Sequence, residues 1–258
     1  MGEPGATVGD GQRVTVVTGA ASGMGRALCV RLANRGQPTV AVDIDPNGLG
    51  WVDEYPTIAG CVADVATAEG NSAMVALAQE RFGGLDAAVL NAAVFPFGPI
   101  EQLPISEFDR LIAVNLRGVF LGIRAALPVL RARGGGAILI TASVSGLLGD
   151  PNNSVYGATK AGVINIVKAV AHEIGPENIR INAICPGPTL NAARDQPEFR
   201  QTPNYERISQ LTALKRWADP DELAAVMEFL ISPAASYVTG TAIPVDGGWS
   251  AAHSPSVS

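Results

Sequence analysis

Short, unbroken apolar runs alternate along the chain with longer amphipathic stretches. The runs are rich in β-branched residues and too short for helices, so each predicts a buried strand; they cover residues 14–17, 39–42, 58–62, 87–90, 137–141, 179–184 and 241–245. The stretches between them have a helical apolar period and predict helices over 23–35, 68–82, 106–130, 155–174 and 220–231. Ser106 is the expected N-cap of the longest helix.

This alternation predicts one α/β domain. Strands that are apolar on both faces are typical of a parallel sheet that helices cover on both sides, the doubly wound arrangement. No internal repeat or low-complexity linker divides the chain, so we expect a single domain over residues 13–258 behind a flexible N-terminal tail of residues 1–12. Residues 186–215 are polar and weakly periodic, and a loop of that length in a compact domain is usually functional or disordered.

Composition and charge exclude several classes of function. Of the 258 residues, 47% are apolar and 16% are charged, which is typical of a globular protein. The net charge of −6 and the lack of a basic block argue against nucleic acid or a membrane surface as a partner. No uninterrupted apolar run approaches the ~18 residues of a membrane span, and the start of the chain lacks the basic and apolar parts of a signal peptide, so we expect a cytoplasmic protein.

The three cysteines, Cys29, Cys61 and Cys185, are odd in number and far apart. We interpret them as reduced core residues rather than disulfide partners or metal ligands. The two histidines, His172 and His253, cannot form a zinc site by themselves, and we expect no metal site.

A glycine-rich turn lies between the first predicted strand and the first predicted helix. Gly19, Gly23 and Gly25 allow the backbone to turn tightly and to approach a pyrophosphate, while the start of the helix supplies N–H donors. Taken alone such a motif is often only a tight turn, but its place between a strand and a helix favours a dinucleotide site. No Gly-Lys-Ser/Thr follows it, which argues against a P-loop.

Asp43 ends the second predicted strand, 18 residues past Gly25, where a carboxylate can accept hydrogen bonds from an adenosine ribose. The alternative is a solvated aspartate at a strand end. A protein that binds NADP would be expected to have a basic side chain in the turn or just after Asp43, where it could meet the 2′-phosphate. This chain has Ser22 and Ile44 at these places. The sequence therefore predicts NAD(H) as the cofactor.

Tyr156 and Lys160 stand one turn apart in a predicted helix, so they share one face. A tyrosine has a pKa of about 10 in water, and a nearby cation lowers that pKa and favours the phenolate. Most such pairs lie on solvated faces, but Ser143 follows a strand thirteen residues upstream, at the sheet edge where ligands bind. Asn91 ends another strand at that edge. Asn115 lies inside a helix, where an amide suggests a tertiary hydrogen bond, although a surface position remains the alternative.

With these residues in place, the sequence resembles the short-chain dehydrogenase/reductase family, in its classical subgroup, from Val14 to Trp249. The motifs that carry the resemblance are residues 18–25, Asp64-Val65, Asn91-Ala92-Ala93, Asn115, Ser143, Tyr156 with Lys160, Pro186-Gly187 and Asp246-Gly247-Gly248. The resemblance implies a Rossmann-type parallel sheet of seven strands.

The resemblance also implies a catalytic tetrad. Tyr156 would be the acid/base, and Ser143 would orient and polarise the carbonyl. Lys160 would bind the nicotinamide ribose and lower the tyrosine pKa, and Asn115 would position a water in the proton relay. Together with the glycine turn and Asp43, the expected cofactor-binding residues are Gly19, Ser22, Gly23, Met24, Gly25, Asp43, Ile44, Asp64, Val65, Asn91, Ala92, Ala93, Tyr156, Lys160, Pro186, Gly187 and Thr189.

The chain departs from the family's pattern in two places. Ala93 stands where the family usually has glycine, which adds a methyl group near the cofactor and removes no polar group. The family often has a threonine four residues past the glycine of Pro186-Gly187. Here that position is Asn191, and Thr189 lies two residues earlier, so it stays open which of the two contacts the nicotinamide.

We expect residues 188–216 to form a mobile substrate-binding lid, because the segment is polar and broken by prolines. The lid side chains expected to point inward are Leu190, Phe199, Tyr205, Leu211 and Leu214. The opposite wall is expected from residues 94–97, including Phe95 and Phe97, and from Val144, Ser145, Leu147 and Leu148. None of these is a cation, so a mostly apolar or aromatic secondary alcohol or ketone is predicted. The alternative is that the aromatic residues only pack the loop against the domain.

The predicted reaction is hydride transfer between a nicotinamide and such a substrate, with Tyr156 taking or giving the hydroxyl proton. A nucleotide-sensing protein and a structural subunit are alternatives outside catalysis, but they would have little reason to retain Ser143, Tyr156 and Lys160 together. Within enzymes the rival is a dehydratase or epimerase that holds NAD tightly. The resemblance also implies a homotetramer.

Overall fold

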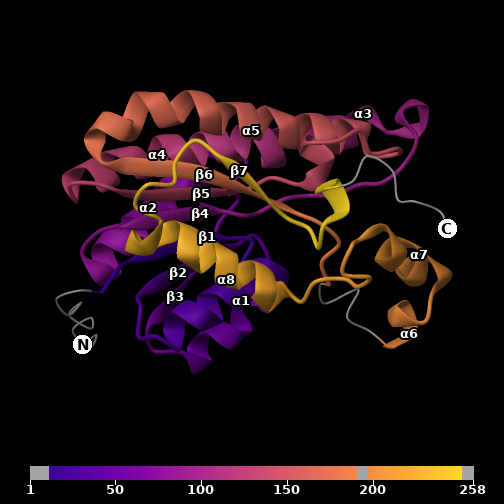
Figure 1. The fold of residues 1–258 in the computed structure, drawn as a ribbon. Helices are drawn as coiled ribbons and strands as arrows, with labels where there is room; N and C mark the ends of the chain where they lie inside the picture. The colour runs from indigo at the N-terminus through magenta and orange to yellow at the C-terminus, as the bar shows by residue number, and fades with distance from the viewer. Residues whose placement is uncertain (1–11, 191–196, 252–258) are drawn as a thin grey trace.

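The computed structural model describes residues 12–190 and 197–251 and centres on a seven-stranded parallel sheet (Figure 1). The strands are β1 (Thr15–Thr18), β2 (Thr39–Asp43), β3 (Ile58–Val62), β4 (Ala87–Leu90), β5 (Gly136–Thr141), β6 (Ile179–Pro186) and β7 (Ala242–Val245). Their order across the sheet is β3-β2-β1-β4-β5-β6-β7, and every neighbouring pair is parallel. The strand order runs outwards in one direction from β1 to β3 and in the other direction from β4 to β7. The crevice at the carboxyl ends of β1 and β4 is therefore the switch point where such sheets bind ligands.

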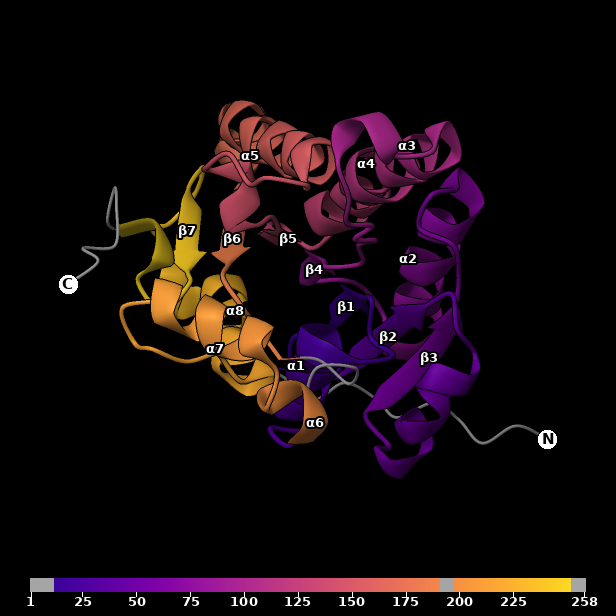
Figure 2. The same ribbon diagram turned by 90° about the vertical axis from the view of Figure 1, so that its right-hand side faces the viewer.

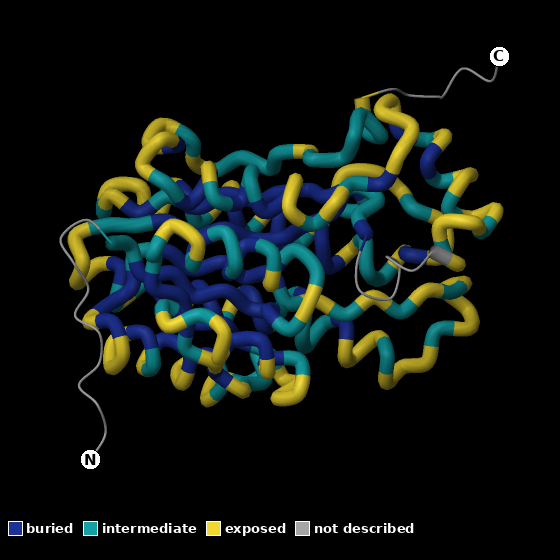
Figure 3. Tube along the Cα trace, turned by 90° about the horizontal axis from the view of Figure 1, so that it is seen from below, coloured by how far each residue is buried: buried dark blue, intermediate teal, exposed yellow. Residues whose placement is uncertain are grey.

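Helices cover both faces of the sheet, as the apolar strands require. On one face lie α2 (Ala68–Phe82), α4 (Gly118–Ala132) and α5 (Ser154–Ile174), and on the other lie α1 (Gly23–Ala33) and α8 (Pro220–Ile231). Each layer has its own buried cluster, and Figure 3 shows that the buried residues follow the strands and the inner helix faces. The predicted doubly wound fold is therefore confirmed. Cys29, Cys61 and Cys185 are all buried and unpaired, as expected.

The longest predicted helix differs from the expectation. It is divided into α3 (Ile105–Leu111), a π-helical turn, η3 (Ile112–Arg117), and α4, and it begins after Pro104 rather than at Ser106. Ser106 is therefore not the N-cap, because Pro104 already holds an extended backbone and Ile105 starts the helix. By length and composition the run Ile105–Ala132 would suffice to cross a membrane, but α4 packs here against α2, β4 and β5 as part of the core.

The polar segment 186–215 is not a plain loop. It contains two short helices, α6 (Pro197–Arg200) and α7 (Pro203–Leu211), which lie side by side (Figure 2) and project beyond the sheet (Figure 1). Thr202 caps α7 by accepting a hydrogen bond from the Tyr205 N–H. A further 3-10 segment, Asn47–Glu54, follows β2 and was not predicted. The predicted tail falls outside the described residues except for Gln12, and the predicted lid is described except for residues 191–196.

Candidate active site

The glycine turn after β1 is packed too tightly for side chains. A Cβ on Gly25 would lie 2.2 Å from the Gly19 carbonyl oxygen, and Gly19 itself has a φ of +70°, which favours glycine. Ser22 stands at the N-cap of α1, but its side chain makes no capping hydrogen bond. The first N–H groups of α1 are therefore left for another acceptor, as a phosphate site requires.

Asp43 lies at the end of β2 beside this turn. Its two oxygens each accept a backbone hydrogen bond, Oδ2 from the Ala21 N–H at 2.9 Å and Oδ1 from the Asp45 N–H at 3.1 Å. The carboxylate is thus held in place between the turn and the loop after β2. Arg26, the basic residue that follows the glycine turn directly, lies over the Trp51 ring at 5.2 Å and does not line the cavity described below.

Asn91 ties three strands together at the switch point. Its Nδ2 donates to the Thr18 carbonyl at 2.9 Å, and its Oδ1 accepts from Thr141 Oγ1 at 3.0 Å. Its backbone N–H donates to Thr18 Oγ1. Because these hydrogen bonds join the ends of β1, β4 and β5, Asn91 holds the edge of the sheet next to the glycine turn in place.

Asn115 is fully buried in the π-helical turn. Its Oδ1 accepts the Val94 N–H and its Nδ2 donates to the Val94 carbonyl, both at 2.9 Å. The tertiary hydrogen bonds that the sequence suggested are present, and they fix the segment after β4 that carries Phe95. That Asn115 also positions a water stays a prediction.

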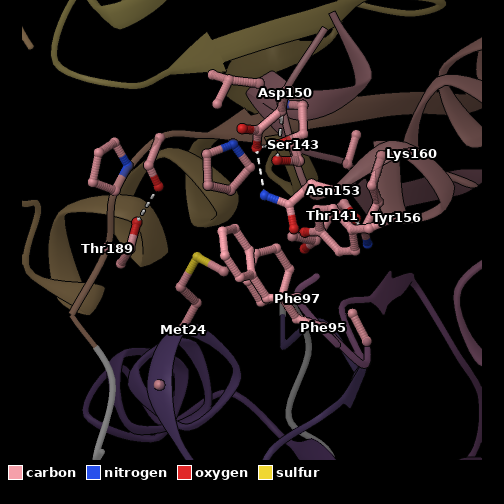
Figure 4. A pocket seen from close by; sticks show the side chains of 18 of the residues that line it. Met24, Phe95, Phe97, Thr141, Ser143, Asp150, Asn153, Tyr156, Lys160 and Thr189 are labelled. Carbon is pink, nitrogen blue, oxygen red and sulfur yellow. Dashed lines mark hydrogen bonds between the residues drawn. The ribbon is translucent and has the colours of Figure 1, made fainter. Parts of the chain in front are cut away.

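Lys160 and Tyr156 lie together on α5, as their spacing predicts. Lys160 is 1% exposed, and its Nζ donates to the Thr141 carbonyl at 2.7 Å and lies 5.6 Å from the centroid of the Tyr156 ring. Burial lowers the pKa of Lys160 to about 8. The Phe95 ring packs edge-on against the Tyr156 ring with centroids 4.6 Å apart. The phenol therefore stands between a buried amine and an aromatic wall (Figure 4).

Ser143 follows β5 and is 7% exposed. Its Oγ accepts the Ser145 N–H at 3.1 Å, which directs the hydroxyl, and no described residue accepts the Ser143 O–H. That hydrogen is available to a substrate oxygen. Figure 4 shows Ser143, Tyr156 and Lys160 on the same side of one cavity.

This cavity has a volume of about 1160 Å³. The predicted site residues that line it are Gly19, Ser22, Gly23, Met24, Asp43, Asn91, Ala92, Ala93, Phe95, Phe97, Ser143, Val144, Ser145, Tyr156, Lys160, Pro186, Gly187, Thr189 and Leu190. Five of the predicted catalytic and cofactor-binding residues lie outside its lining: Gly25, Ile44, Asp64, Val65 and Asn115. Gly25 supports the turn from behind, Ile44 is 65% exposed beyond Asp43, and Asp64 and Val65 follow the neighbouring strand β3.

Thr189 lines the cavity and donates from Oγ1 to the Gly187 carbonyl at 3.0 Å, whereas Asn191 lies outside the described residues. On the lid side the expectations hold only in part. Leu190 and Leu211 line the cavity, but Leu214 is 62% exposed away from it, and Phe199 and Tyr205 instead pack around Trp217. The aromatic residues of the lid therefore pack against one another and against Trp217. Leu147 and Leu148 also stay outside the cavity, because they turn to the surface, 39% and 45% exposed.

Sequence reasoning missed several lining residues. Asp150, Asn153, Asn204, Arg207, Ile208, Trp217 and Trp249 all line the cavity. None of the wall residues predicted from the sequence is a cation, but α7 adds Arg207 to the lining, and its Nη2 donates to Asn204 Oδ1. The missing signal was the helix itself, since Asn204, Arg207 and Ile208 share one face only if residues 203–211 are helical.

Comparisons with known proteins agree with this geometry. Residues 19–250 match the family model described as Enoyl-(Acyl carrier protein) reductase. The chain is 40% identical to levodione reductase of Leifsonia aquatica, over 93% of this chain and 95% of that protein. It is 33% identical to D-beta-hydroxybutyrate dehydrogenase of Rhizobium meliloti, over 93% and 99% of the two chains. The crystal structure of 3-ketoacyl-(acyl-carrier-protein) reductase from Brucella melitensis complexed with NADH superposes with a TM-score of 0.85 at 33% identity, covering 92% of this chain and 98% of that one.

Proposed function

The chain belongs to the short-chain dehydrogenase/reductase family of oxidoreductases, which act on alcohols and ketones, and we propose that it uses NAD(H) with Tyr156 as its acid/base. The observation that carries this proposal is the buried Lys160 beside Tyr156, in the same cavity as the glycine turn and Asp43. One continuous cavity can thus take a dinucleotide and a substrate together, which is what direct hydride transfer needs.

The residues present fit a nicotinamide dinucleotide. The turn from Gly19 leaves no room for a Cβ at Gly25, and α1 offers uncapped N–H groups to a pyrophosphate. Asp43 would accept the hydroxyls of the adenosine ribose. Asp64 and Val65 would flank the adenine, and Pro186, Gly187 and Thr189 would hold the nicotinamide side.

The fixed position of Asp43 supports NAD over NADP. A 2′-phosphate would bring a charge of about −1.5 to −2 towards a carboxylate that two backbone N–H groups hold in place. At ~4 Å and an effective dielectric of about 20, each unit of like charge costs roughly 4 kcal/mol before salt screening. Because no cation of the described residues stands at this end of the cavity, we expect at least about tenfold preference for NAD(H) in kcat/KM.

Four polar side chains have separate roles in the proposed reaction. When bound, the nicotinamide accepts the hydride from a carbinol carbon or returns it to a carbonyl carbon. Tyr156 takes the alcohol proton in oxidation and gives it back in reduction, and the cationic form of Lys160 favours the phenolate. Ser143 donates its hydroxyl hydrogen to the substrate oxygen, and Asn115 acts as a positioning residue through Val94.

The proposal is tested by following nicotinamide reduction or oxidation with NAD and NADP against a panel of secondary alcohols and ketones. Tyr156→Phe should keep less than about a tenth of the wild-type kcat while binding NADH with unchanged affinity, because only the proton-transferring oxygen is lost. Tyr237→Phe is the matched control, since Tyr237 is fully exposed and far from the chemistry. Equal rates with both cofactors would remove the role given to Asp43, and an active Tyr156→Phe would require another acid/base.

A further inference from the structure

We propose that Asp150 and Asn153 form a subsite that recognises a second hydroxyl group on the substrate. The inference rests on the proposed function and names its substrate class: an alcohol or ketone that carries a hydrogen-bond donor away from the reacting carbon. Both residues line the cavity next to the catalytic candidates, Asp150 in the loop after Ser143 and Asn153 three residues before Tyr156. Figure 4 shows both side chains on the wall that also holds Ser143.

The hydrogen bonds of Asp150 fix its carboxylate against this wall. Oδ2 accepts from Ser145 Oγ at 2.7 Å and from Asn153 Nδ2 at 2.8 Å. No described residue donates to Oδ1, and no cation of the described residues pairs with the carboxylate. An ionised carboxylate is a pure acceptor with about four lone-pair sites, so Asp150 retains capacity for a further donor.

The same contacts decide the orientation of the Asn153 amide. Because a carboxylate cannot donate, the Nδ2 group must face Asp150 and the Oδ1 atom must face away from it. Asn153 is only 5% exposed, and its Oδ1 has no hydrogen-bond partner among the described residues. A buried amide oxygen without a donor is costly, so a donor that reaches it, from water or from a ligand, is stabilising.

At Asp150 Oδ1 the subsite therefore presents a charged acceptor to which no described residue donates. A substrate hydroxyl can donate to this oxygen, whereas an ether or carbonyl oxygen beside it would meet a negative charge. Sites built to bond a substrate O–H discriminate strongly against analogues that lack it, because the buried polar groups are then left unpaired. The apolar walls from Phe95, Phe97 and Leu190 hold the remainder of such a substrate.

The test compares cyclohexanediols with their monomethyl ethers, the second oxygen being placed in turn at each ring position. We expect wild-type kcat/KM to favour at least one diol over its ether by about tenfold or more. In Asp150→Ala the preference should fall to within about threefold of unity. In Asp150→Asn the amide oxygen can still accept from Ser145 and hold the loop, but an NH₂ donor replaces the free oxygen, so the preference should turn towards the ether.

Asp53→Ala is the matched control, because Asp53 is an exposed aspartate outside the cavity and its loss should leave the diol preference unchanged. A wild-type enzyme that turns over both compounds of every pair equally overturns the inference and leaves the proposed function standing. So does a diol preference that survives Asp150→Ala. Loss of all turnover in both Asp150 variants would show that Asp150 only holds the loop after Ser143 in place, and this outcome also overturns the inference. A wild-type protein inactive towards every alcohol and ketone with either cofactor refutes the proposed function, and the inference falls with it.

Discussion

Burial of Lys160 makes the stability of the cofactor-free protein depend on pH in a definite direction. Lys160 is 1% exposed, its amine donates one hydrogen bond among the described residues, to the Thr141 carbonyl, and burial lowers its pKa from 10.5 to about 8. Between these two values the unfolded chain binds the proton more tightly than the folded protein does. Stability must therefore rise as the pH increases from about 8 to about 10.5, and the burial penalty is fully present below about pH 8.

The size of the effect follows from the two pKa values. A difference of roughly 2.5 pKa units corresponds to about 3 kcal/mol over the whole interval, at 1.36 kcal/mol for each unit. Between about pH 7.5 and about pH 9.5 the same two values give about 2 kcal/mol.

Urea unfolding of the wild type and of Lys160→Met at these two pH values measures this change in the free energy of unfolding. Methionine keeps the length of the side chain without the charge. The buried thiol of Cys29 has a raised pKa and changes stability in the opposite sense, but it does so in both proteins. Burial also raises the pKa of Cys185, and the charge of Lys160 opposes that rise, so the comparison includes the interaction of these two groups. The stability of the wild type relative to the variant should therefore increase by about 2 kcal/mol at the higher pH. A relative stability that does not change with pH would refute the burial argument.

Three further outcomes are expected. Gly25→Ala should raise the KM for NAD by at least about tenfold, because its Cβ would lie 2.2 Å from the Gly19 oxygen, while Gly50→Ala, with nothing within 4 Å, should leave cofactor kinetics unchanged. Phe95→Ala and Phe97→Ala should each raise the KM for apolar ketones several-fold. Phe229→Ala, which removes an exposed ring outside the cavity, is the control. An unchanged KM in both cavity variants would contradict an apolar wall. Light scattering should give about four times the chain mass of 26.6 kDa, and a mass near that of one chain would exclude the tetramer.

Much of the fold could be predicted because its signals are local and repeated. The strands 58–62 and 87–90 and the helices 68–82 and 220–231 have the predicted bounds, since each is a continuous apolar run or a clear helical period. The helix after residue 105 was predicted as one element because both of its parts have a helical apolar period, and α3 is too short for the shift in phase at the turn to stand out. In the lid, α7 has a polar sequence, and its helix depends on the Thr202 cap and on aromatic packing around Trp217.

The site, like the fold, has residues that could be predicted from the sequence and residues that could not. The turn, Ser143, Tyr156 and Lys160 were found because their roles need particular residue types at particular spacings. Arg207 and Asn153 were not, because nothing in their neighbours along the chain places them at the cavity. Arg207 reaches it through a helix hidden in a polar segment. Asn153 matters through an unpartnered oxygen, which is a property of three-dimensional contacts alone.

The π-helical turn at Ile112–Arg117 has a consequence for insertions and deletions. Such a turn holds one residue more than the α-turn it replaces. Removing a single residue, for example Ala113, would let α3 and α4 join as one regular helix, with α4 still facing α2 and the sheet. The amide of Asn115 would then turn away from Val94. We therefore expect a shortened chain to keep its sheet and to lose the hydrogen bonds that hold the segment carrying Phe95, so the extra residue positions this wall of the cavity.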